Sequence, residues 1–165
     1  MLAINDVQVY PLAMENSIFS SIPFWAGVAG VMIAQLLKPF IHYVATKEFN
    51  PRLIFINGGM PSSHTSGICA ITTAIGMTNG FASDIFVLSF AISMILMNDA
   101  MNVRLETGKQ AQLLNEWSEV LEELFSDKMF SRQHFKTMVG HTIVQVFWGL
   151  ILGVAIGIGV FYLMR

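Results

Sequence analysis

The chain has 165 residues, of which 54% are hydrophobic and only 12% charged, and its formal net charge is -2 at pH 7. Charged residues make up about a quarter of a soluble domain, so this composition excludes an ordinary soluble globular protein. The length fits one domain, and residues 1–165 are expected to form a single membrane domain. The single cysteine, Cys69, excludes an intrachain disulfide.

Four apolar blocks predict an all-α integral membrane bundle with four transmembrane helices. We expect these multi-pass spans at about residues 17–38, 62–80, 84–103 and 141–164. The first block runs from Ser17 to Leu37 without a charge, which is long enough to cross a bilayer.

Small residues recur at four-residue spacing on the first and last predicted helices. The two sets are Ala26, Gly30 and Ala34, and Gly149, Gly153 and Gly157. Such stripes let helices approach closely in lipid. The sequence leaves open whether they pack within one chain or form a homo-oligomer through these glycine-rich helices.

The segment Gly58–His64, with the sequence Gly-Gly-Met-Pro-Ser-Ser-His, precedes the second span. The glycines permit a free turn, and Pro61 fixes φ where a helix would begin. Ser62 and Ser63 can cap this helix, whose first N–H groups attract an anion. His64 is placed to exchange a proton with a phosphate there. An ordinary capped turn explains these residues about equally well.

The third apolar block stops at Asn98-Asp99. An ionisable group at this depth is costly, and it marks a site or a buried partner. Asp99 can be the structural counter-ion of Arg104, although five residues is not the ideal helical spacing for a pair.

Residues 106–125 predict a cytoplasmic amphipathic helix. Its apolar positions recur every three or four residues, and its opposite face carries four glutamates, namely Glu116, Glu119, Glu122 and Glu123. An acidic face is a poor match for an anionic leaflet. We therefore expect the apolar stripe to pack on protein, over the cytoplasmic ends of the spans or against a second copy, rather than on the membrane surface.

The distribution of basic residues predicts the orientation. All of them except Arg165 fall in residues 38–61 and 104–140, which lie on one side of the four spans. The positive-inside rule places these two segments in the cytoplasm and both termini outside.

Polar side chains gather at the cytoplasmic ends of all four predicted spans. They are Lys38, Ser62, Ser63, His64, Asn98, Asp99, Arg104 and His141. Phosphoryl transfer needs cations for the phosphate oxygens, a nucleophile and an acid for the leaving group. Gln145 lies one turn beyond His141 and can orient its ring. The close ligand spacing that supports a metal site is missing from His64, Asp99 and His141.

Several of these segments together resemble a known family. They are Gly58–His64, Asn98–Ala100 with Val103-Arg104, Gly108–Ala111 with Leu114-Asn115, and Gly140–Thr142. They are similar to the divergent branch of the type-2 phosphatidic acid phosphatases, which is related to acid phosphatases and vanadium-dependent haloperoxidases. The resemblance implies a metal-independent phosphatase with a phosphohistidine intermediate and no cofactor.

The resemblance also implies roles for single residues. His64 matches the general acid of a Pro-Ser-Gly-His motif in which Ser63 replaces glycine, and His141 matches the nucleophile. Lys38, followed by proline, resembles the remnant of a lysine motif. Arg104 would bind phosphate, and Lys109 is included among the substrate-binding residues.

Two departures from the family pattern stand out. Arg104 and His141 are separated by 36 residues instead of a few, and Arg132 is a nearer second candidate. Gln145 occupies the place of an acidic partner of the nucleophile, and glutamine cannot stabilise an imidazolium as a carboxylate does. Asp99 can supply that charge from another helix; without it, we expect weak catalysis or none.

We therefore expect a membrane lipid phosphatase that hydrolyses a phosphomonoester or pyrophosphate headgroup. The alternatives are a catalytically weak or inactive phosphate- or lipid-binding protein, and a small oligomeric transporter with Asp99 as a relay. The expected partners are membrane lipid and a phosphorylated lipid substrate, with no nucleic acid.

Overall fold

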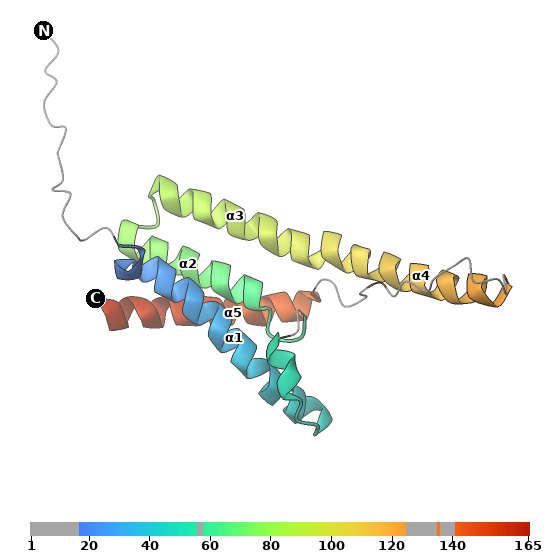
Figure 1. Ribbon diagram of the computed structural model, residues 1–165. Helices are drawn as coiled ribbons and strands as arrows, with labels where there is room; N and C mark the ends of the chain where they lie inside the picture. Colours follow the sequence, from blue (N-terminus) through green and yellow to red (C-terminus); the bar gives the residue numbers. More distant parts are fainter. Residues whose placement is uncertain (1–16, 56–57, 125–134, 136–140) are drawn as a thin grey trace, which may run out of the picture.

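A computed structural model describes residues 17–55, 58–124, 135 and 141–165. The described chain folds into α1 (Ile22–Thr46), α2 (Ser63–Asn79), α3 (Asp84–Met101), α4 (Val103–Leu124) and α5 (Ile143–Met164), with short 3-10 turns at Ile18–Ser20 and Pro51–Phe55. Helices α1, α2, α3 and α5 form a bundle, and α4 extends beyond it (Figure 1). The predicted all-α membrane bundle is confirmed.

Helix α2 is the centre of the bundle, packing against α1, α3 and α5. The glycine stripe of α5 faces it so closely that a Cβ at Gly157 would lie 2.7 Å from the carbonyl oxygen of Ala70. On α1, a Cβ at Gly30 would lie 2.9 Å from the carbonyl oxygen of Ser66. Both small-residue stripes are therefore buried against α2 within one chain, and a homo-oligomer stays a prediction.

Hydroxyl groups join α2 to α3. The Oγ1 of Thr72 lies 2.8 Å from the Oγ of Ser89 and 2.7 Å from the Oγ of Ser93. Each such interhelical bond contributes about 0.6 kcal/mol in a membrane protein, where the hydrophobic effect does not drive helices together.

Within the described residues, three helical stretches are long and apolar enough to cross a membrane: α1, the stretch that begins with α3, and α5. Helix α2 has 17 residues, a length of about 25 Å that is at the lower limit for a span. Its neighbours cover it on three sides. The helix expected at about residues 62–80 is thus present as the short central helix, and its crossing of the membrane stays a prediction.

The first helix is longer than expected. The sequence places the end of the first span at Lys38, whereas α1 continues through Pro39 to Thr46 and ends at Lys47, which has a φ of 62°. Proline lacks an N–H but is tolerated inside membrane helices, where neighbouring groups satisfy the freed carbonyl. Lys38 and Pro39 are both buried inside this helix.

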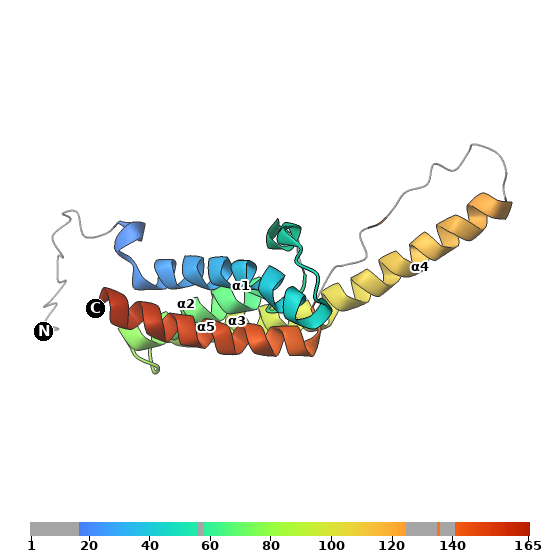
Figure 2. The same ribbon diagram turned by 90° about the horizontal axis from the view of Figure 1, so that it is seen from below.

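Helix α4 follows α3 after the single residue Asn102 and points away from the bundle (Figure 2). Among the described helices it packs only on α3. Leu113, Trp117 and Val120 of its apolar stripe are 52%, 63% and 55% exposed. The predicted amphipathic helix is present, but it does not pack over the ends of the spans; a second copy of the chain stays a prediction.

Candidate functional site

Three helix ends are tied together by two backbone hydrogen bonds. The N–H of Ser62, before α2, donates to the carbonyl of Gln145 in the first turn of α5 at 3.1 Å. The N–H of His141, before α5, donates to the carbonyl of Ala100 near the end of α3, also at 3.1 Å. These bonds fix the starts of α2 and α5 against the end of α3.

The loop before α2 has a backbone that requires glycine. Gly58 and Gly59 have φ values of 107° and 79°, which a side chain would strain, and a cis Met60–Pro61 bond follows. Ser62 then caps α2, because its Oγ accepts from the N–H of Thr65 at 3.4 Å. A Cβ at Gly59 would lie 3.9 Å from Cδ of Lys38, so the buried lysine of α1 lies beside this loop.

The two histidines of the expected mechanism face each other. The ring centroids of His64 and His141 are 6.3 Å apart, with an angle of 74° between the ring planes. His141 is buried and His64 is exposed. Lys38 and Arg104 are both close enough to His64 to interact with it electrostatically.

His141 does not lie on α5, as the sequence analysis assumed, because it precedes the N-cap residue Thr142. Gln145 is the third residue of α5, and its Oε1 accepts from the N–H of Thr142 at 3.1 Å. The Oγ1 of Thr142 accepts in return from the N–H of Gln145 at 3.4 Å, which completes a capping box. The oxygen of Gln145 therefore caps the helix instead of orienting His141.

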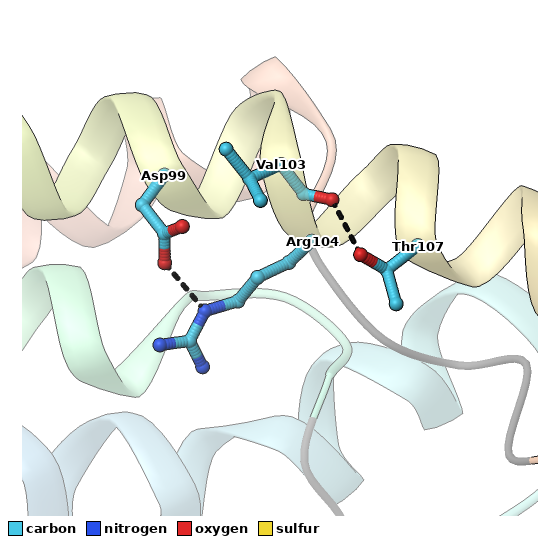
Figure 3. A network of polar contacts seen from close by, with 4 residues as sticks. All are labelled: Asp99, Val103, Arg104 and Thr107. Carbon is cyan, nitrogen blue, oxygen red and sulfur yellow. Dashed lines mark hydrogen bonds and ion pairs between the residues drawn. The ribbon is translucent and has the colours of Figure 1, made fainter.

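Asp99 and Arg104 form the expected ion pair, with the Nε of Arg104 2.7 Å from the Oδ2 of Asp99 (Figure 3). Asp99 belongs to α3 and Arg104 to α4, on either side of the junction at Asn102. Their spacing is therefore not that of an uninterrupted helix. The terminal nitrogens of the guanidinium point away from Asp99, which leaves them for another acceptor.

Arg104 and the two histidines line one end of a cavity of about 730 Å³. Its polar end holds Ser62, His64, Thr65, Arg104 and His141, and the rest of its lining comes from apolar residues of α1, α2 and α3. The structure thus brings together four residues that the sequence analysis selected, from the starts of α2, α4 and α5.

The profile of the divergent PAP2 family matches residues 19–156. The chain belongs to this family. It is also similar to the uncharacterized membrane protein YuiD of Bacillus subtilis strain 168, with 26% identity over 145 residues that cover 83% of this chain and 92% of YuiD. No solved structure matches the chain. The family resemblance stated from the motifs is confirmed.

Other expected site residues of this divergent PAP2 chain lie outside the cavity lining. Ser63 is buried as the first residue of α2. Lys109 lies on α4, where its Nζ pairs with the Oε1 of Glu106 at 2.7 Å. Arg132, the second candidate for the phosphate-binding arginine, lies outside the described residues. Across the described segments, no three side chains of the metal-ligating types come together.

Two contributors were missed by the sequence analysis. Thr65 lines the polar end of the cavity, and its Oγ1 donates to the Oγ of Ser62 at 3.0 Å. Ala100 accepts a hydrogen bond from the backbone N–H of His141, whereas in the sequence it stands out only as part of the Asn98–Ala100 motif. Every residue has a backbone carbonyl, so the residue type at position 100 contains no signal for this role of Ala100.

Proposed function

We propose that this divergent PAP2 protein is a membrane lipid phosphatase acting on a phosphomonoester or pyrophosphate headgroup. One observation carries the proposal: a single cavity has His64, His141, Arg104 and Ser62 at one end and apolar walls along the rest. Such a polarity fits an amphiphile whose phosphate lies at the histidines and whose chain lies among the helices.

In the proposed reaction, a nitrogen of His141 attacks phosphorus and the bond from phosphorus to the leaving oxygen breaks. His64 donates a proton to that oxygen, so the leaving group departs as an alcohol or a phosphate. Water then attacks the phosphohistidine with His64 as base, which releases inorganic phosphate and restores both histidines. The two rings lie at the same end of the cavity, with their centroids 6.3 Å apart.

The charges around the cavity suit a phosphate. The first N–H groups of α2 begin at Ser63, at the electropositive end of the helix. Arg104 presents its terminal nitrogens while Asp99 holds its Nε. Lys38 adds a buried positive charge beside the glycine loop. Fixed donors of this kind stabilise the charge on the equatorial oxygens in the transition state.

The test is release of phosphate from a panel of lipid phosphates by purified protein in detergent, in the presence of EDTA. His64→Ala and His141→Ala should each abolish release. His42→Ala is the matched control, because His42 lies on α1 outside the cavity lining and its loss should leave release unchanged. Full activity in both cavity variants would end this mechanism.

A second candidate is a protein that binds the phosphate without hydrolysing it. The capping box supports this alternative, since it commits the Oε1 of Gln145 to the N–H of Thr142 and away from the nucleophile. This candidate predicts that inorganic phosphate raises the unfolding temperature of the protein without product formation. Loss of that shift in Arg104→Ala would locate the bound anion in the cavity.

A further inference from the structure

The apolar part of the cavity is a groove between α1 and α3. Among the described helices, α1 and α3 both pack on α2 but not on each other. The space left between them has α2 as its floor, with Ile68 and Ile71. We call this the α1–α3 groove; its walls include Val28 and Met32 from α1 and Leu96 from α3.

The groove opens sideways toward lipid. Val28, Met32 and Leu96 are 38%, 55% and 43% exposed, and all three lie on helices long and apolar enough to cross the membrane. A hydrocarbon chain can therefore enter from the bilayer without passing through water. The groove is continuous with the polar end, because the two histidines and the groove walls line one and the same cavity.

Aromatic rings lie at the far end of the groove. Phe24 lines the cavity and packs edge-on against Phe19 and Trp25, with ring centroids 5.7 Å and 5.3 Å away. The Nε1 of Trp25 donates to the carbonyl of Phe19 at 2.7 Å and holds this cluster in place. Along α2 the lining extends from Ser62 to Ile71, a distance of about 14 Å at the rise of an α-helix.

We propose that the α1–α3 groove binds the first part of one hydrocarbon tail of the phosphorylated lipid, with Val28 as a tail-contacting residue. This inference rests on the proposed function only for the identity of the headgroup. In lipid, a tail gains little from the hydrophobic effect, so binding depends on contact with the groove walls and on the anchored phosphate. The protein would thus distinguish a phosphate on a membrane-embedded chain from a soluble phosphate ester.

The test uses hexadecyl phosphate with a photoreactive diazirine near the middle of its chain. After irradiation, peptide mass spectrometry should find the label on α1 and α2 around Val28 and Ile71. Val28→Trp fills the groove and should lower the labelling at least fivefold. Val154→Trp is the matched control, since Val154 of α5 is 36% exposed but lies outside the cavity lining, and it should label normally.

Three further arms separate the outcomes. Met32→Trp repeats the test at a second wall position, in case Val28→Trp does not fold. Hexadecanol carrying the same diazirine should label the groove much less, because it lacks the phosphate anchor. Inorganic phosphate should compete with the labelling. Label spread over the lipid-facing side of α5, unchanged labelling in both groove variants, or equal labelling by hexadecanol would overturn the proposal.

Labelling does not require turnover, so the two proposals fail separately. Groove labelling without phosphate release from any lipid would reject the phosphatase and keep the tail site. Phosphate release with equal kcat/KM for butyl and hexadecyl phosphate, and no effect of Val28→Trp on either, would keep the phosphatase and reject the tail site.

Discussion

Asp99 and Arg104 form an ion pair of 2.7 Å across the junction between α3 and α4, and the arginine also lines the cavity that contains both histidines. The carboxylate thereby fixes the direction of the guanidinium. In the proposed mechanism Asp99 is a positioning residue for the phosphate-binding arginine, and its role as the charge partner of His141 stays a prediction.

Asp99→Asn should lower kcat/KM for phosphate release while leaving stability nearly unchanged. The pair is partly exposed, with side chains 52% and 34% accessible, so it contributes no more than about 1 kcal/mol to folding. A misdirected guanidinium should reduce kcat/KM about three- to tenfold, mainly through KM, because ground-state and transition-state binding both weaken.

The control for this change is Glu106→Gln. It breaks the ion pair of Glu106 with Lys109, which has the same length of 2.7 Å but lies on exposed α4 outside the cavity lining. Steady-state kinetics of the two variants should differ clearly. Equal activity of Asp99→Asn and wild type would show that Asp99 does not position Arg104.

Gln145→Glu should stabilise the fold without raising activity. Glutamate at the third position of α5 preserves the capping box with Thr142 and adds a negative charge at the helix N-terminus, a gain of about 0.3–1 kcal/mol. The new carboxylate would still point at the N–H of Thr142, so it would not reach His141 as a partner. Thermal unfolding and phosphate release measure the two effects.

Gln145→Ala is the matched loss variant and should destabilise the protein, since it removes half of the capping box. A large rise in turnover in Gln145→Glu would contradict the geometry. It would show that this side chain leaves the cap during catalysis and acts on His141.

The bundle and much of the site can be predicted from residue patterns, because each pattern lies within one short segment of the chain. Apolar blocks predict helices in lipid, and the Gly58–His64 segment predicts a turn that caps a helix. The same logic failed at Pro39, where a proline that would end a helix in water lies inside α1. It also failed at His141, which lies one residue before the N-cap residue Thr142 and therefore outside α5.

The α1–α3 groove could not be predicted from sequence. Val28, Met32 and Leu96 have the side chains of any lipid-facing position, and the groove exists because two helices rest on a third without touching each other. That arrangement depends on the close approach permitted by Gly30 on one side and on the hydroxyl contacts of Thr72 on the other. Helix periodicity contains no information about such a gap.

Gly153→Ala should destabilise the bundle. A Cβ at Gly153 would overlap the carbonyl oxygen of Ser66 and lie 2.8 Å from the Cβ of Cys69. Helices α2 and α5 would have to separate, which costs about 1–3 kcal/mol in a closely packed interface. Unfolding in detergent by increasing SDS measures the change.

The control is Gly159→Ala on the same helix, where a Cβ would meet nothing within 4 Å among the described residues. This change should leave stability equal or slightly higher, because alanine favours a helix by up to about 1 kcal/mol over glycine. Equal stability of the two variants would mean that the α2–α5 interface is loose in the membrane.

The orientation of the chain can be tested by labelling single cysteines in intact cells with a membrane-impermeant maleimide. The native Cys69 is buried and is first replaced by alanine. We propose that the site lies on the cytoplasmic side, so Glu48→Cys should react only after the cells are permeabilised. Ala82→Cys, in the turn between α2 and α3 at the opposite end of α2, should react at once.

The two positions are a matched pair because both are exposed and both lie outside the α-helices. Labelling in the reverse order would place the histidines outside the cytoplasm, and the basic residues near them would then be retained for phosphate rather than for orientation. The geometry of the cavity would be unchanged, but its substrate would have to be presented in the outer leaflet.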